Sequence, residues 1–184
     1  MTQETIFKKD DLEFIRCSEN NYCITFNVKN NDMILPKIIN FDLLKLVYDL
    51  NPDIYERTTM NIIDENNAKT VILMKHFFKD LGKEQSYFSL NITKVVDNDN
   101  CTKFISSPNN DSLPEFIPDE ARHFSIININ FSFEKLSNHE IKFTCNILLQ
   151  ESKEKMPQII ENFIGQILYK IFKRVKLFIE NVKI

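Results

Sequence analysis

The chain has 184 residues, of which 43% are hydrophobic and 27% are charged, and its formal net charge at pH 7 is −3. This length and composition predict one globular domain, residues 1–184, with a sizeable core. The slightly acidic charge balance provides no general attraction to nucleic acid, so we expect no nucleic-acid partner.

Cysteine, histidine and glycine usage argues against several kinds of site. Cys17, Cys23, Cys101 and Cys145 form no CxxC pair, and the three histidines are scattered along the chain. A zinc site needs clustered ligands, so we expect no metal. The chain has only two glycines and no glycine-rich phosphate-binding motif, and we expect no cofactor.

The N-terminal residues 1–11 are mostly polar and lack the apolar segment of a signal peptide. No segment approaches the roughly 18 consecutive apolar residues of a membrane-spanning helix. We therefore expect a cytoplasmic protein whose cysteines are free thiols.

The first two thirds of the chain predict short strands in hairpins around one helix. Residues 12–17 and 22–28 are expected strands, with polar turn residues 18–21 between them. Pro36 opens an apolar helical segment that ends at Asn51-Pro52. Two further hairpins are expected, one from residues 55–63 and 69–78 and the other from residues 86–96 and 102–106.

Residues 107–120 form the longest irregular segment and contain three prolines. Leu113, Phe116 and Ile117 lie in it among polar neighbours. Long ordered loops are often functional, so this segment is either a mobile lid or a connector whose apolar side chains cap the core.

The strongest strand pattern lies in residues 122–133 and 140–150, which predict a long antiparallel hairpin with one apolar face. That face is expected to contain Ile127, Ile129, Phe131, Phe133, Ile141, Phe143, Cys145, Ile147 and Leu149.

Residues 155–182 predict one long helix, because apolar residues such as Phe163 and Ile167 recur at steps of three and four. Pro157 suits its first turn, where a missing N–H is tolerated. Gly165, in the middle of the helix, is unfavourable by about 1 kcal/mol relative to alanine. We expect this glycine to leave room either for a closely packed strand or for a ligand.

The order of elements is a hairpin, a helix, about six strands in hairpins and one long helix, with no β–α–β alternation. It predicts an α+β fold in which a curved antiparallel sheet grips the C-terminal helix. A strongly curved sheet need not close completely on one helix, and the gap between them is a candidate ligand cavity.

This order of elements resembles the START family of lipid-transfer domains within the helix-grip, or Bet v 1-like, superfamily. The last third of the chain is also similar, with a proline-containing loop before Arg122 at a strand start, then Met156-Pro157 at the start of the final helix. The tryptophan usual in the family is absent. The resemblance implies a tunnel for one lipid, with residues 107–120 as a gate over its mouth and Arg122 near the strand end.

We therefore expect a binding protein for a lipid or sterol-like molecule, with transient membrane contact possible through the basic end of the helix and no catalytic residues. One alternative is an enzyme on the same scaffold, with His76, His123 or Tyr87 as acid or base. By strand parity, His123 is expected to share a face with Ile127 and Ile129. Another alternative is a protein-interaction module without a ligand. The expected ligand-binding residues are Arg122, Ile127, Ile129, Phe131, Phe143, Cys145, Phe163, Ile167 and Phe116.

Overall fold

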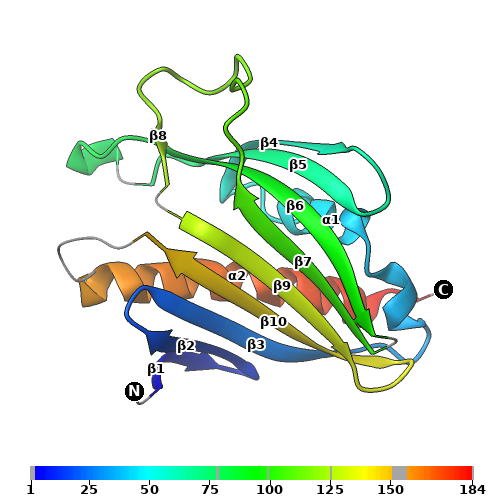
Figure 1. Ribbon diagram of the computed structural model, residues 1–184. Helices are drawn as coiled ribbons and strands as arrows, with labels where there is room; N and C mark the ends of the chain where they lie inside the picture. Colours follow the sequence, from blue (N-terminus) through cyan, green and yellow to red (C-terminus); the bar gives the residue numbers. More distant parts are fainter. Residues whose placement is uncertain (1–2, 78, 99, 125, 151–156, 184) are drawn as a thin grey trace.

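A computed structural model describes residues 3–77, 79–98, 100–124, 126–150 and 157–183 (Figure 1). In these residues, the elements are β1 (Glu4–Lys9), β2 (Leu12–Ser18), β3 (Asn21–Lys29), the 3₁₀ helix η1 (Leu35–Ile38), α1 (Phe41–Asp49), β4 (Tyr55–Ile62), β5 (Asn67–Met74), the 3₁₀ helix η2 (Lys79–Leu81), β6 (Ser86–Asn98), β7 (Cys101–Pro108), β8 (Arg122–His123), β9 (Ile126–Lys135), β10 (Glu140–Leu149) and α2 (Gln158–Asn181).

The strands of the described residues form one sheet in the order β1-β2-β3-β10-β9-β7-β6-β5-β4, and the short β8 pairs with β6. Every pair is antiparallel except β6 with β8. The N-terminal hairpin joins the C-terminal one because β3 pairs with β10, with Ile24 opposite Cys145. The middle strands join through β7 and β9, with Phe104 opposite Phe131.

Helix α2 crosses this curved sheet on one face, behind the strands in the view of Figure 1, and α1 contacts α2 on the same side. This arrangement confirms the predicted α+β fold, in which a curved antiparallel sheet grips a long C-terminal helix. The sequence prediction missed the edge strand β1, whose only apolar residues are Ile6 and Phe7. The predicted helix at residues 36–50 is two elements, because Asn40 caps α1 with its Oδ1 accepting from the Leu43 N–H at 3.1 Å. The predicted helix start at Lys155 and Met156 lies outside the described residues.

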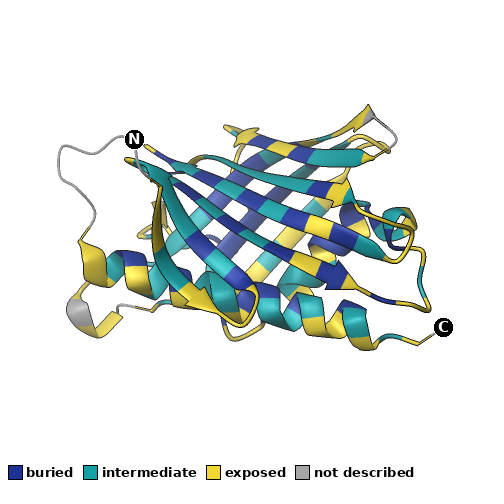
Figure 2. Cartoon of the chain, turned by 90° about the horizontal axis from the view of Figure 1, so that it is seen from below, coloured by how far each residue is buried: buried dark blue, intermediate teal, exposed yellow. Residues whose placement is uncertain are grey.

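Side chains from the concave face of the sheet and from α2 make one continuous core. Buried positions alternate along the strands and continue onto the side of the helix that faces them (Figure 2). The Phe143 ring lies 4.8 Å from the Phe26 ring, 4.9 Å from Phe172 and 5.1 Å from Phe133, centroid to centroid. This aromatic cluster joins β3, β9 and β10 to the second half of α2.

Gly165 lies where β1 and β2 of the sheet pack closely against α2. A Cβ atom at this position would lie 3.0 Å from Cδ1 of Phe14 and 3.5 Å from Cβ of Phe7. Of the two interpretations of this glycine, close packing against the strands is therefore the one that the structure supports.

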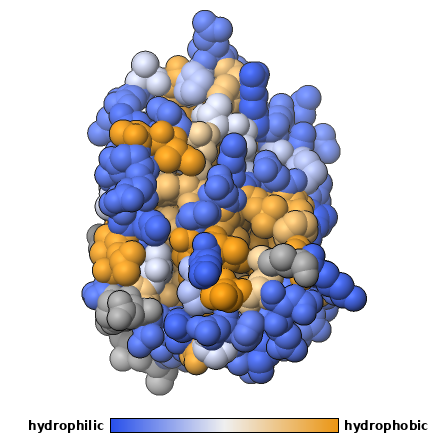
Figure 3. All heavy atoms as spheres, turned by 90° about the vertical axis from the view of Figure 1, so that its right-hand side faces the viewer, coloured by the Kyte–Doolittle hydropathy of each residue, from blue (hydrophilic) through white to orange (hydrophobic). Residues whose placement is uncertain are grey.

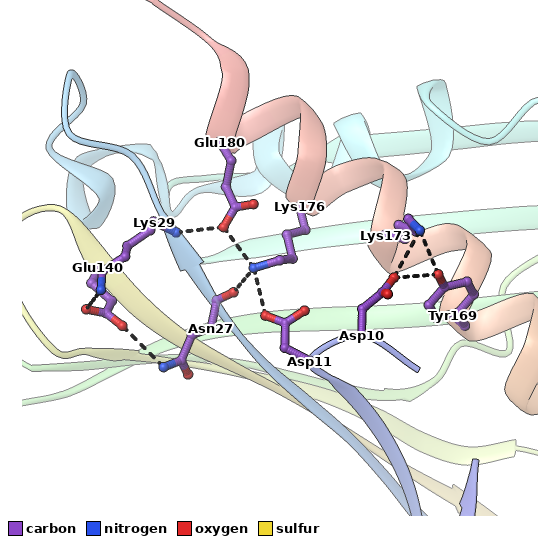
Figure 4. A network of polar contacts seen from close by, with 9 residues as sticks. All are labelled: Asp10, Asp11, Asn27, Lys29, Glu140, Tyr169, Lys173, Lys176 and Glu180. Carbon is purple, nitrogen blue, oxygen red and sulfur yellow. Dashed lines mark hydrogen bonds and ion pairs between the residues drawn. The ribbon is translucent and has the colours of Figure 1, made fainter. Parts of the chain in front are cut away.

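Polar contacts fasten the second half of α2 to the N-terminal strands (Figure 4). Asp10 and Asp11 form the β1–β2 turn, where Asp10 has a φ of 54°, a left-handed conformation that aspartate tolerates. Asp10 Oδ2 accepts from Nζ of Lys173 at 3.0 Å and from the Tyr169 hydroxyl at 2.8 Å. Asp11 pairs with Nζ of Lys176 at 2.9 Å.

On its other flank, α2 is tied to the connection between α1 and β4. Asp53 pairs with Lys170 and with Arg174, whose Nη2 lies 3.2 Å from Asp53 Oδ2. Each of four basic side chains of α2 thus pairs with a carboxylate: Lys170, Lys173, Arg174 and Lys176. The end of the molecule at which α2 ends shows hydrophobic residues among hydrophilic ones (Figure 3). Membrane contact through this basic end of the helix stays a prediction. In the described part of the chain, no helix is long and apolar enough to span a membrane.

Candidate functional site

A cavity of about 250 Å³ lies between the concave face of the sheet and α2. Its volume lies just below the roughly 300–1,000 Å³ common for small-molecule sites. The described residues that line it are Phe14, Tyr22, Leu44, Val47, Tyr48, Tyr55, Ile72, Met74, Lys75, Phe77, Glu84, Ser86, Phe88, Leu90, Ile92, Ser106, Phe124, Ile126, Ile129, Phe131, Cys145, Ile147, Leu149, Ile160, Glu161, Phe163, Ile164, Ile167, Leu168, Ile171 and Phe172.

The lining follows from the two periodicities of the sequence. In a strand, alternate side chains face the same side, so Cys145, Ile147 and Leu149 of β10 all reach the cavity. In a helix, residues three and four apart share a face, which brings Ile164 and Ile167 of α2 to the opposite wall. The site is therefore apolar over most of its surface and suited to an apolar ligand.

A buried polar cluster interrupts this lining where α2 begins. Glu161 is 2% exposed, and its Oε1 accepts a hydrogen bond of 2.8 Å from the Tyr22 hydroxyl. Its Oε2 lies 3.3 Å from Nη2 of Arg16, which also pairs with Glu4 Oε2 at 3.1 Å. Burial and the Glu161 carboxylate raise the pKa of Tyr22 well above its usual value, so its hydroxyl remains a donor at neutral pH.

Further polar side chains line the cavity away from this cluster. Ser106 Oγ accepts from the Ile129 N–H at 2.7 Å. The rings of Tyr48 and Tyr55 meet edge to face at 5.2 Å, and burial raises the pKa of Tyr48 to about 12. Burial also raises the pKa of the Cys145 thiol, which is therefore protonated at neutral pH and unsuited to nucleophilic attack.

The cavity reaches the molecular surface at the connection between β5 and β6. Phe77, which is 39% exposed, and the exposed Glu84 both belong to the lining and to the surface. The Phe77 ring meets the Phe163 ring of α2 edge to face, with centroids 5.8 Å apart. The described residues thus place the mouth between this connection and the first half of α2, with two aromatic rings across it.

Five of the nine residues expected to bind a ligand line the cavity: Ile129, Phe131, Cys145, Phe163 and Ile167. Phe143 is buried but not in the lining. It packs behind Phe131 and Phe172, which do line the cavity, so it fills the core beyond the cavity wall.

The expectation that Ile127 faces inward is wrong, since its side chain is 40% exposed while Ile126 is buried and lines the cavity. The pairing of β9 with β10 shifts between Leu148 and Leu149, where Ile126 rather than Ile127 comes opposite Leu149. A one-residue shift moves side chains to the other face, so strand parity fails at this end of β9.

The described lining of the cavity contains no residue of the expected gate, residues 107–120. Phe116 and Ile117 pack with Val71 and Leu73 of β5 on the outer face of the sheet. Ile72, which lies between Val71 and Leu73 in the sequence, faces the cavity instead, so β5 is apolar on both faces. Phe116 and Ile117 therefore cap a second apolar cluster, separate from the main core, which agrees in part with the connector interpretation. Leu113, the third apolar side chain of the loop, is 41% exposed.

Arg122 is also placed away from the interior. Its side chain is 72% exposed, and its Nε lies 2.9 Å from Oε2 of Glu84 at the mouth. Arg122 was expected at the end of a strand, and it is the first residue of β8. It does not belong to the cavity lining.

The candidate acid or base residues are likewise outside the described lining. His123 is exposed, contrary to the parity expectation, because β8 and β9 are separate elements and alternation does not carry across them. Its ring meets that of Tyr87 edge to face at 5.4 Å. His76 Nε2 lies 2.5 Å from the Lys83 carbonyl oxygen. Within the described residues, no group of three or more His, Cys, Asp or Glu side chains is arranged to hold a metal.

Sequence reasoning missed Tyr22, Glu161 and the tyrosines Tyr48 and Tyr55. A signal for Glu161 was present, since it lies four residues before Gly165 and within the apolar stripe formed by Ile160 and Ile164. A charged residue inside such a stripe must be buried with partners, and these partners come from strands at the other end of the chain.

The sequence matches no protein-family model, and a comparison with curated proteins found no match. Solved structures are similar in fold. The human StarD13 lipid transfer and protein localization domain has a TM-score of 0.72 at 9% identity, covering 98% of this chain and 90% of that one. The human StAR-related lipid transfer protein 5 has a TM-score of 0.68 at 8% identity, covering 95% and 84%.

A fragment of a STAR-related lipid transfer protein from Xanthomonas axonopodis has a TM-score of 0.63 at 8% identity, covering 96% of this chain and 98% of that one. These similarities extend over nearly the whole chain and confirm the START-like helix-grip fold expected from the order of elements.

Proposed function

We propose that this START-like domain binds a lipid or another largely apolar molecule in the cavity between its sheet and α2. The observation that supports this proposal is the cavity itself, a space of about 250 Å³ with a mainly apolar lining and a mouth at the surface. The similar structures are named as lipid-transfer proteins or domains, which agrees with this proposal. Apolar linings discriminate weakly, so shape and a few polar groups would select the ligand.

In this proposal, Ile129, Phe131, Cys145, Phe163 and Ile167 contact the ligand. The ligand enters at the mouth between the β5–β6 connection and α2, where the Phe77 and Phe163 rings must separate. The domain binds without catalysis, since the buried Cys145 thiol is protonated and the candidate histidines lie outside the described lining.

We further propose that release or uptake of the ligand involves transient contact of the mouth with a membrane. Phe77 and Ile159 expose apolar side chains at this end, and Ile159 is 75% exposed. Exposed aromatic and aliphatic groups beside a ligand mouth suit insertion between lipid headgroups. Cytoplasmic location and the absence of a nucleic-acid partner stay predictions from the sequence.

Binding is tested with Nile red, an uncharged apolar dye whose fluorescence rises in an apolar site. We expect saturable binding to the wild-type protein and its loss in Ile167→Trp, where the larger side chain fills the cavity. Leu177→Trp is the matched control, because Leu177 lies on the same helix but is exposed and outside the described lining. Native mass spectrometry with lipid extraction then identifies any co-purified ligand.

Equal dye binding by wild-type and Ile167→Trp protein would place the dye elsewhere. No dye binding and no co-purified lipid would contradict the proposed function and favour the protein-interaction module without a ligand.

A further inference from the structure

Two cysteines lie side by side on the outer face of the β2–β3 hairpin. Tyr22 and Ile24 of β3 are buried on the inner face, so alternation turns Cys23, between them, to the outer face. The thiol of Cys17, near the end of β2, is in hydrogen-bonding contact with Cys23. Both cysteines are free and half-buried. Neither belongs to the described lining of the cavity, so the proposed ligand site does not account for this pair.

A shift in strand register gives Cys17 freedom to move toward Cys23. The β2–β3 pairing shifts between Arg16 and Ser18, and Cys17 is the extra residue that has no partner in β3. Cβ atoms directly opposite each other in antiparallel strands are about 4.5–5.5 Å apart, whereas a disulfide needs about 3.8 Å. A regular register would therefore keep two sulfur atoms apart. The unpaired backbone at Cys17 can make this small adjustment.

The two thiols are suited to different steps of an oxidation. Burial, together with the neighbouring Cys17 thiol, raises the pKa of Cys23 to about 11, so Cys23 is a thiol rather than a thiolate at neutral pH. It is therefore a poor first nucleophile, which leaves the first step to Cys17. One attacking cysteine beside one resolving cysteine is a common arrangement in thiols that respond to oxidants.

The other two cysteines lack this arrangement. Cys145 is 1% exposed, and burial raises the pKa of its thiol, so it presents little reactive thiolate. Cys101 Sγ lies 3.5 Å from Oγ of Ser132, and no described contact joins it to another cysteine. Oxidation of the folded protein should therefore select Cys17 and Cys23.

The pair lies directly behind the contacts that hold the start of α2. Arg16 and Tyr22, the residues just before the two cysteines, are opposite each other in the β2–β3 pairing. Their side chains point to the inner face, where both contact Glu161 in the first turn of α2. A covalent bond between the strands at this point restricts their separation, and with it the opening of this turn of the helix.

We propose that Cys17 and Cys23 are a redox-sensitive dithiol, which a peroxide oxidises to an intramolecular disulfide that steadies the start of α2. A reducing cytoplasm keeps such a pair as thiols, and a disulfide forms there only transiently, when an oxidant is present. A dithiol reductant restores the thiols by exchange. This inference is independent of the proposed function, because no step of it needs a ligand.

The oxidation proceeds in two steps. The Cys17 thiolate attacks hydrogen peroxide, the O–O bond breaks, and Cys17 becomes a sulfenic acid while the departing hydroxide takes up the proton that Cys17 released. The Cys23 sulfur then attacks the Cys17 sulfur, the S–O bond breaks, and water leaves with the proton of Cys23. The two thiols lose two electrons and two protons, and one hydrogen peroxide becomes two water molecules.

Limited treatment with hydrogen peroxide, followed by mass spectrometry of the intact protein, tests this chemistry. We expect the wild-type protein to lose two hydrogens without gaining oxygen, and dithiothreitol to restore the original mass. Cleavage after Glu19 separates the two cysteines, so fragments that stay joined without a reductant identify the bond. Cys17→Ser and Cys23→Ser should abolish this product, whereas the matched control Cys101→Ser should form it as fast as the wild-type protein.

The single variants also test the order of the two steps. In Cys23→Ser, we expect a sulfenic acid on Cys17, which dimedone traps. In Cys17→Ser, the Cys23 thiol should stay unmodified at the same peroxide concentration. Trapping on Cys23 as fast as on Cys17 would contradict the assigned order.

Hydrogen exchange measures the effect on α2. We expect the backbone amides of residues 160–165 to exchange more slowly in the disulfide form than in the reduced form, while those of residues 175–181 keep their rate. Equal rates at residues 160–165 in the two forms would overturn the effect on the helix. Oxygen added to Cys101 or Cys145 while Cys17 and Cys23 stay thiols would overturn the inference as a whole, as would a bond that forms only after unfolding in urea.

Discussion

Gly165→Ala places a methyl group in a close contact between α2 and the sheet. Its Cβ would lie 3.0 Å from Cδ1 of Phe14, whereas apolar carbons pack best at about 3.5–4.0 Å, so the ring must move by about half an ångström. Phe14 is buried and stacked on Tyr22 with ring centroids 5.5 Å apart, which limits that movement.

The magnitude follows from two opposed effects. Alanine stabilises a helix by about 1 kcal/mol relative to glycine. Overpacking a core costs about 1–3 kcal/mol. We therefore expect Gly165→Ala to lower the free energy of unfolding by about 0–2 kcal/mol, although the same change at an exposed helix position would raise it.

Urea unfolding followed by far-UV circular dichroism measures this difference. Phe14→Leu, made alone and with Gly165→Ala, completes a double-mutant cycle. The smaller side chain at residue 14 should make the alanine less destabilising, and the coupling energy should be at least about 0.5 kcal/mol. If Gly165→Ala stabilises the protein by the full helix-propensity gain and shows no coupling to Phe14, the reasoning from close packing is refuted.

Three further changes probe the core, the helix anchor and the outer loop. Phe143→Ala should lower the free energy of unfolding by about 3–5 kcal/mol in urea titrations, whereas Phe178→Ala, at an exposed position of α2, should cost much less; similar losses would contradict the core assignment. Asp53→Asn should cost about 0.5–1 kcal/mol at pH 7, since its ion pairs with Lys170 and Arg174 are partly exposed. These cations hold the pKa of Asp53 well below its usual value. The contribution of Asp53 to the free energy of unfolding is therefore complete above about pH 4 and is lost as the pH falls further. The free energies of unfolding of the two proteins should converge in acid, and a constant difference would contradict the pairing. Phe116→Ala should destabilise the protein but leave its affinity for Nile red unchanged, while a large loss of affinity would restore the loop as a gate.

Local patterns in the sequence determined the elements that carry the fold. The twofold alternation of Ile129, Phe131 and Phe133 predicts a strand, and the three- and four-residue steps around Phe163 and Ile167 predict a helix, because these periods belong to the backbone geometry itself. The sequence therefore predicted the two cavity walls that β9 and α2 form. The family resemblance predicted the helix-grip arrangement.

The tertiary structure alone decided what lies across from these faces. The β9–β10 register shift turns Ile127 outward, and no local pattern signals it, because the shift depends on how two strands pair. The polar cluster joins Tyr22 to Glu161 over 139 residues of chain, which only the β3–β10 pairing and the crossing of α2 bring together. Periodicity fixes the face on which a side chain lies. Contacts between distant segments depend instead on pairing energies summed over the whole core. For that reason, only the folded chain shows the Glu161 carboxylate with its partners in the cavity wall.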